Sequence, residues 1–136
     1  MAPEFVDTNI LVYAHDSGMG ARFETAISLL SRLAADRVGA LSTQVLNEFY
    51  NTATRKLHRS SEDIEETIQG LSQWQLHRPT HGDIIKAIQL QRRYQLSWWD
   101  AMIVNSAIQT GSRILWSEDI QAGQRFETVT IRNPFA

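Results

Sequence analysis

The sequence predicts an α/β domain in which helices cover both faces of a small, parallel central sheet. Short apolar runs alternate with longer segments of helical periodicity along the whole chain. The order strand, helix, strand favours parallel pairing through right-handed crossovers. Helical segments outnumber strands, so we expect a three-layer α/β/α arrangement. Because no linker, repeat or low-complexity tract interrupts the pattern, we expect residues 1–136 to form a single domain.

The expected elements follow one another with short connections. Short apolar runs predict strands at residues 4–7, 38–41, 76–78, 113–116 and 128–131. Apolar stripes at helical spacing predict helices at residues 21–35, 44–56, 60–74, 80–94 and 97–110. Hydroxyl residues stand where these helices begin, and Ser60, Thr80 and Ser97 each fit a capping box with the aspartate three residues later.

Composition excludes several classes of protein. Hydrophobic residues at 43% and charged residues at 21% are typical of a soluble globular protein. No apolar run approaches the roughly 20 residues that cross a bilayer, so no membrane contact is expected. The first residues lack the basic start and apolar centre of a signal peptide, which makes the cytoplasm the expected location. The absence of cysteine removes disulfides, thiolate nucleophiles and cysteine metal sites.

The charge pattern is close to balanced but rich in arginine. A net charge of −2 is not that of a polycation that coats nucleic acid. Arginine nevertheless outnumbers lysine, and its planar side chain suits bidentate contact with phosphate. The clusters at residues 55–59 and 92–93 are interpreted either as solvated helix faces or as a rim that faces phosphate.

Four acidic residues stand out by their positions. Asp7 ends the first expected strand, and Glu48 lies one turn into the helix after the second. Asp100 lies in the first turn of the most apolar helix, and Asp119 follows the strand at residues 113–116. The carboxyl ends of parallel strands share one edge of a sheet, so we expect Asp7, Glu48 and Asp119 to converge there. Asp100 joins them if its helix begins beside that edge.

Each of these acids also has a purely structural interpretation. Asp7 can cap a following helix, and Glu48 can be a solvated helix residue. Asp100 fits a capping box with Ser97, and Asp119 can cap a turn. The combination favours function, because Asp100 stands between two tryptophans and an apolar run, where a charge is costly unless paired or coordinated.

A cluster of four carboxylates without matching basic partners needs a cation, since the charges repel one another. In the absence of cysteine, oxygen ligands favour Mg²⁺ or Mn²⁺ over zinc. Divalent ions held by a few carboxylates activate water and stabilise the leaving oxygen in phosphodiester hydrolysis. The pattern therefore predicts a metal-dependent enzyme that acts on a phosphodiester.

The acids occur in four segments that match a known family. The segments are Asp7-Thr8-Asn9, Asn47-Glu48-Phe49-Tyr50, Trp99-Asp100-Ala101-Met102-Ile103 and Ser117-Glu118-Asp119-Ile120. They resemble the acidic motifs of PIN-domain ribonucleases. More narrowly, the chain resembles VapC-type toxins of type II toxin–antitoxin systems, and the resemblance covers essentially the whole chain in order.

The resemblance implies a PIN-like fold and a metal-dependent endoribonuclease that prefers single-stranded RNA. It also implies a cognate VapB-type antitoxin that blocks the acidic cleft, and a homodimer. Asp7 and Asp100 would be the principal ligands of Mg²⁺ or Mn²⁺, and Glu48 would complete the first site or hold its waters. Asp119 would be the fourth acid, although the adjoining Glu118 can take that role. Second-shell groups that orient carboxylates or water would be Thr8, Asn9, Ser117 and Glu118.

Two other classes of function stay open. Phosphoryl-transfer enzymes with an aspartate nucleophile also carry acids at this sheet edge, but the position two residues after Asp7 is Asn9 and not a second aspartate. A phospho-acceptor receiver domain would need a lysine at the end of the last strand, where this chain has Arg132. The remaining alternative is a non-catalytic α/β binding module whose acids only cap helices. EDTA distinguishes these classes, because only a metal-dependent nuclease loses RNA cleavage.

Tryptophan and histidine supply two smaller expectations. Trp98 and Trp99 point about 100° apart on a helix and cannot both face one core, so one of them is a candidate contact for a second copy or an antitoxin. Among the histidines only His77 and His81 have the spacing of a helical zinc site, and Pro79 interrupts it. We expect the histidines on the surface or in turns.

Overall fold

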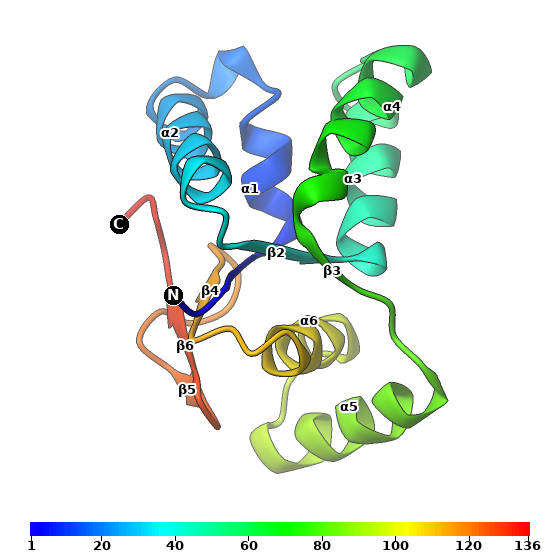
Figure 1. Cartoon of the computed structure of the whole chain (residues 1–136), viewed down its shortest axis with the longest axis vertical. Helices are drawn as coiled ribbons and strands as arrows, with labels where there is room; N and C mark the ends of the chain where they lie inside the picture. Colours follow the sequence, from blue (N-terminus) through cyan, green and yellow to red (C-terminus); the bar gives the residue numbers. More distant parts are fainter.

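The computed structural model, which describes residues 1–136, contains one six-stranded sheet with helices on both faces (Figure 1). The strands are β1 (Glu4–Val6), β2 (Gly39–Ser42), β3 (Gln75–His77), β4 (Ile114–Trp116), β5 (Arg125–Phe126) and β6 (Val129–Arg132). Their order in the sheet is β3-β2-β1-β4-β6-β5, and every neighbouring pair is parallel except β5 and β6. The predicted α/β class with a small, mainly parallel sheet is confirmed.

The helices form the two outer layers. They are α1 (Thr8–Tyr13), α2 (Ala21–Asp36), α3 (Thr43–Arg55), α4 (Ser61–Gly70), α5 (His81–Tyr94) and α6 (Trp98–Gln109). In Figure 1, α1 to α4 lie above the sheet, α6 lies below it, and α5 packs on α6. None of these helices has both the length and the continuous apolar run that crossing a bilayer requires.

The predicted caps explain where the helices begin. The hydroxyls of Ser42, Ser60, Thr80 and Ser97 each accept a hydrogen bond from the backbone N–H three residues later. Only Thr80 closes a complete capping box, in which the Asp83 carboxylate accepts from the Thr80 N–H at 2.9 Å. The capping boxes predicted at Ser60 and Ser97 are therefore wrong in one respect: each hydroxyl caps its helix, but the aspartate three residues later does not accept from the backbone N–H of the cap residue.

The structure differs from the predicted elements in two places. The helix expected at residues 60–74 ends at Gly70, and a 3₁₀ turn (Leu71–Gln73) then leads Trp74 into extended backbone. The Trp74 ring lies directly over Gly39, so tertiary packing overrides the apolar stripe that suggested a longer helix. The second difference is β5, whose two residues are too few to show a periodic pattern and which gives the sheet its antiparallel edge.

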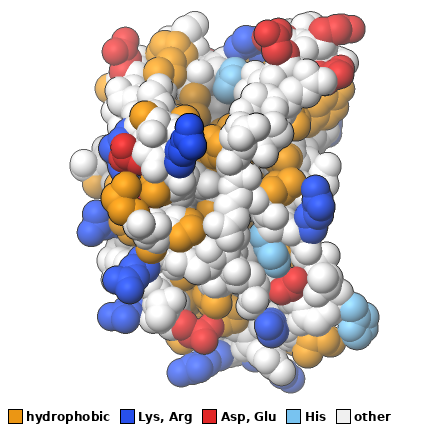
Figure 2. All heavy atoms as spheres, in the orientation of Figure 1, with side chains coloured by type: hydrophobic (Ala, Val, Ile, Leu, Met, Phe, Trp, Pro, Cys, Tyr) orange, Lys and Arg blue, Asp and Glu red, His pale blue; other side chains and the backbone are white.

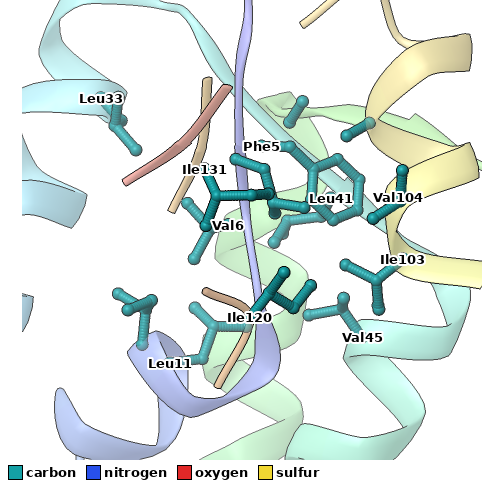
Figure 3. Close-up of a cluster of buried hydrophobic side chains, with 14 of the residues drawn as sticks. Phe5, Val6, Leu11, Leu33, Leu41, Val45, Ile103, Val104, Ile120 and Ile131 are labelled. Carbon is teal, nitrogen blue, oxygen red and sulfur yellow. The ribbon is translucent and has the colours of Figure 1, made fainter. Parts of the chain in front are cut away.

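The core lies on both sides of β1 and fixes the strand that leads to Asp7. Phe5 and Val6 are fully buried, and in Figure 3 they lie among apolar side chains from neighbouring strands and helices. Helix α6 is buried along Ala101–Ala107, because the sheet covers one side and α5 the other. Burial of one such large apolar side chain stabilises the fold by about 1.5–3 kcal/mol. The sheet edge that follows Val6 is therefore held on a rigid base.

The close approach of Trp74 to Gly39 can be tested by substitution. A Cβ atom at position 39 would lie 2.3 Å from the Trp74 ring, whereas a Cβ atom at Gly70 would meet nothing within 4 Å. We expect Gly39→Ala to lower the free energy of unfolding by roughly 1–3 kcal/mol. Gly70→Ala, the matched control, is expected to be neutral or slightly stabilising. Chemical denaturation of both variants checks this, and equal stabilities would contradict the packing described here.

Candidate functional site

Asp7 lies at the centre of the candidate site, directly after β1. Its backbone N–H donates to the Trp116 carbonyl of β4 at 2.9 Å, which continues the β1–β4 pairing. One carboxylate oxygen accepts from the Thr8 N–H at 2.7 Å and thereby caps α1. The other accepts from the Ser117 hydroxyl at 2.8 Å. The capping interpretation of Asp7 is correct, but it uses only one of the two oxygens.

Burial is the main cause of the unusual acidity of Asp7. It raises the pKa of the carboxyl from 3.8 to about 6, against the lowering effect of the bonds from Ser117 and Thr8. The charges of Asp119 and Glu48 raise the pKa further. Asp7 therefore lies close to both of these acids.

Glu48 is brought to the same edge by α3, which begins immediately after β2. Its two carboxylate oxygens accept from the Thr8 hydroxyl at 2.7 Å and from the Gln44 side-chain amide at 2.9 Å. Glu48 is thus half-buried, with its carboxylate held in one orientation, and is not the solvated helix residue that the sequence also allowed. The Thr8 hydroxyl holds this carboxylate, and the role that the family resemblance implies for Thr8 stays a prediction. Gln44 was missed, although its i,i+4 spacing from Glu48 is a recognisable signal.

Asp100 reaches the site from the first turn of α6. Its backbone N–H is capped by the Ser97 hydroxyl at 3.1 Å, and its carboxylate closes no capping box. Partial burial raises the pKa of this carboxyl, and the charges of Asp119 and Glu48 raise it further. Asp100 therefore shares two of its electrostatic neighbours with Asp7.

The adjoining acids Glu118 and Asp119 have different surroundings. Glu118 accepts from the Tyr13 hydroxyl at 2.6 Å and from the Arg22 guanidinium at 2.7 Å. Asp119 is exposed, and its charge raises the pKa of both Asp7 and Asp100. The geometry favours Asp119 over Glu118 as the fourth acid. Its role, like the roles of the other three, stays a prediction.

The four acids Asp7, Glu48, Asp100 and Asp119 form what we call the acidic cluster. No ion pair in the molecule involves any of them. Their donor chemistry fits a hard divalent cation, although no three carboxylates already converge on a single point as a closed ligand set.

Two buried amides beside the cluster support the same fit. Both polar atoms of the Asn9 side chain and the Gln44 Oε1 atom are buried without a hydrogen-bond partner. Burial of such atoms without a hydrogen bond costs free energy unless a ligand or its water satisfies them. Asn9 lies two residues after Asp7, and Gln44 donates a hydrogen bond to Glu48. Asn9 was expected to orient ligands or water, and its buried amide is available for that role.

A second polar cluster joins β3, α5 and α6 and has the connectivity of a catalytic triad. The Ser106 hydroxyl lies 2.8 Å from His77 Nδ1, and His77 Nε2 lies 3.2 Å from an Asp83 oxygen. Ser106 has an exposed fraction of 0%, so its oxygen cannot reach a substrate. This cluster is structural, and His77 is not the surface histidine that we expected.

A cavity of about 660 Å³ lies at the opposite end of the strands from the acidic cluster. Its wall includes Leu33, Val38 and Trp74, and it contains none of the four acids. The carboxyl-terminal edge of the sheet remains the only place where the predicted acids meet.

The family model for the PIN domain matches residues 5–125. The chain belongs to the PIN-domain family. No curated protein matches the sequence of this PIN domain.

Solved structures show the same fold at low identity. A toxin–antitoxin complex from Klebsiella pneumoniae is 23% identical, with a TM-score of 0.69 over 96% of this chain and 97% of that one. VapBC2 from Rickettsia felis, bound to a promoter DNA fragment, is 19% identical, with a TM-score of 0.68 over 96% and 97%. VapC20 from Mycobacterium tuberculosis, a toxin that cleaves the sarcin–ricin loop, is 23% identical, with a TM-score of 0.64 over 82% and 85%. The PIN domain is therefore similar in structure to VapC toxins.

The raised pKa of Asp7 predicts a stability that depends on pH. The folded protein holds the Asp7 proton more tightly than the unfolded chain, so the cost of ionising Asp7 is absent below pH 3.8, grows up to about pH 6 and is complete above it. In metal-free buffer at pH 8 we expect Asp7→Asn to raise the free energy of unfolding by about 1–3 kcal/mol. The difference from wild type should vanish near pH 3.

Urea denaturation at several pH values measures this effect. Glu66→Gln removes an exposed carboxylate from α4 and serves as the control. An Asp7→Asn protein that is less stable than wild type at pH 8 without metal would contradict the electrostatic account of the site.

Proposed function

We propose that this PIN domain is a metal-dependent endoribonuclease toxin that hydrolyses RNA phosphodiester bonds and is neutralised by a cognate antitoxin. One observation carries the proposal: the charges of Glu48 and Asp119 act on both Asp7 and Asp100, and none of these four acids has a basic partner. Acids kept without counter-charges, at the cost of their mutual repulsion, are arranged for a cation that the folded chain does not itself supply.

The residues of the site divide into ligands and groups that hold them. Asp7 and Asp100 would hold Mg²⁺ or Mn²⁺, with Glu48 and Asp119 as the further acids of the cluster. A bound divalent ion would supply an activated water and neutralise charge on the phosphate. Hydrogen bonds fix the direction of two of these carboxylates: Ser117 and Thr8 donate to Asp7, and Thr8 and Gln44 donate to Glu48.

The surface charge supports binding of RNA mainly through a metal ion and not through a basic protein surface. In Figure 2 arginine and lysine side chains occur mainly along the margin of the visible face, interspersed with hydrophobic and uncharged groups. With a net charge of −2, phosphate neutralisation by the protein surface alone gives little affinity for RNA. The cation would therefore bind the scissile phosphate as well as activate the water.

The relatives that crystallised as toxin–antitoxin complexes support an antitoxin partner for this chain. An acidic cluster without basic partners is complementary to a protein segment that carries arginine or lysine. We expect the product of a short neighbouring reading frame, when co-expressed, to bind the chain and suppress its RNA cleavage.

Removal of metal and of single carboxylates tests the enzymatic proposal. Purified protein is expected to cleave single-stranded RNA in Mg²⁺ or Mn²⁺, to stop in excess EDTA and to recover when metal is restored. Asp7→Asn and Asp100→Asn should each slow cleavage by about two orders of magnitude or more, because each removes a ligand and not only a supporting group. Glu62→Gln, which removes an exposed carboxylate from α4, should cleave at the wild-type rate. Cleavage that persists in EDTA would refute the proposal.

We also propose that two copies pair through an apolar surface on α5 and α6, formed by Ile84, Ile85, Ile88 and Trp99. All four side chains are exposed, and Trp99 is 63% exposed. Trp98 instead packs inward beside Ala87, Ala101 and Met102, which leaves Trp99 as the contact candidate of the tryptophan pair. All four residues belong to two helices that pack against each other.

A charge placed on this surface tests the homodimer. Ile85 is 45% exposed, so Ile85→Lys should leave the fold intact while burying an unpaired charge in any contact. We expect the mass from light scattering to fall from that of a dimer to that of a monomer at micromolar concentration. Ile27→Lys, on the exposed side of α2, is the control. Dimers that survive both Ile85→Lys and Trp99→Ala would exclude this interface.

A further inference from the structure

Glu118 stands beside the acidic cluster but is engaged elsewhere, by groups from distant parts of the chain. Tyr13, the last residue of α1, donates its hydroxyl to one carboxylate oxygen at 2.6 Å. Arg22, in the first turn of α2, donates Nε to the other at 2.7 Å. Both oxygens of Glu118 therefore have a donor, and its charge is neutralised by an ion pair.

Phe135 completes this arrangement from the C-terminal segment. Its ring meets the edge of the Tyr13 ring at 5.2 Å between centroids. The Arg22 guanidinium carbon lies 5.9 Å from the centroid of Tyr13 and 5.6 Å from that of Phe135, so two aromatic rings flank the cation. We name these four residues, Tyr13, Arg22, Glu118 and Phe135, the Glu118 clasp.

The clasp holds Glu118 within a tight turn at residues 117–120, and Ser117 joins the start of this turn to Asp7 of the acidic cluster. Ser117 donates its hydroxyl to Asp7 and accepts the backbone N–H groups of Asp119 and Ile120, each at 3.2 Å. Asp119 lies between the clasped Glu118 and Ile120, whose backbone N–H is held by Ser117. The Asp119 carboxylate itself has no hydrogen bond or ion pair that fixes its place. The direction of Asp119 is therefore set by its two neighbours in the chain.

We propose that the Glu118 clasp is a positioning device: it withdraws Glu118 from the acidic cluster and fixes the turn so that Asp119 faces Asp7 and Asp100. This inference rests on the proposed function, because it assigns the clasp a role in how tightly the cluster binds a divalent ion. Tyr13, Arg22 and Phe135 are positioning residues in this account and touch neither metal nor substrate. A clasp that only secured the C-terminal segment would affect stability and leave metal affinity unchanged.

The most conservative test is Tyr13→Phe, which removes the hydroxyl bond to Glu118 and keeps the ring against Arg22 and Phe135. Tyr94→Phe is the matched control, because it removes a hydroxyl from a ring that packs on Phe126, away from Glu118. Two readouts are required: Mn²⁺ affinity by titration calorimetry, and hydrogen exchange of the Asp119 and Ile120 amides.

We expect Tyr13→Phe to weaken Mn²⁺ binding roughly tenfold, the size of effect typical for loss of a group that supports a metal ligand. Exchange of the two amides should become faster, and Tyr94→Phe should match wild type in both readouts. Unchanged Mn²⁺ affinity in Tyr13→Phe would overturn the inference, whether or not the variant is less stable. Wild-type protein that binds no Mn²⁺ would overturn the proposed function first, and this inference with it.

Glu118→Gln separates a clasp from a metal ligand. If Glu118 acts through the clasp, the Arg22→Gln/Glu118→Gln double variant should bind Mn²⁺ about as weakly as Glu118→Gln alone, because both changes remove the same ion pair. Additive losses in the double variant would mean that Glu118 binds the ion directly and would refute the inference. Arg22→Gln, which removes the ion pair but not the Tyr13 bond, should also weaken Mn²⁺ binding, and wild-type affinity in this variant would contradict it.

Discussion

The burial of Asp7 beside other carboxylates is the constraint on which the rest of the structure depends. Asp7 cannot turn toward water, because it follows Phe5 and Val6, which are fully buried beside the sheet. Burying these two side chains together stabilises the fold by about 3–6 kcal/mol, which is enough to offset the roughly 3 kcal/mol that ionised Asp7 costs. The parallel pairs β1–β2 and β1–β4 then place Glu48 and Asp119 beside it. A well-packed core thus holds together charges that would otherwise separate.

Asp7 and Asp83 are both buried aspartates, yet the protein shifts them in opposite directions. Burial raises the pKa of Asp83 as well, but bonds from the Thr80 N–H, the Asn105 amide and the Thr80 hydroxyl, with nearby His77, bring it down to about 2. Asp83 therefore adds stability above pH 3.8 that is lost as the pH falls toward 2, whereas Asp7 costs stability as the pH rises through 6. The larger number of hydrogen-bond donors around Asp83 is the reason that the two pKa values shift in opposite directions.

Local chemistry made most of the fold predictable. The caps at Ser42, Ser60, Thr80 and Ser97 and the apolar stripes depend on neighbours within one turn, so both are visible in the sequence. The acids of the candidate site were also predictable, because strand ends in a parallel sheet share one edge. The partners of Glu118 were not, since Tyr13 and Arg22 lie about a hundred residues earlier in the chain. Trp74 was misassigned for a similar reason: its position depends on Gly39, which only the folded sheet brings near.

The pairing of β1 with β4 has a consequence for the synthesis of the protein. Strand β1 is synthesised well before its partner β4 and the residue Asp119, which follow more than a hundred residues later. Such a contact between distant segments forms late in folding. A nascent chain that has already folded α1 to α4 still lacks two of its four acids. The four acids therefore come together only after Asp119 has been synthesised.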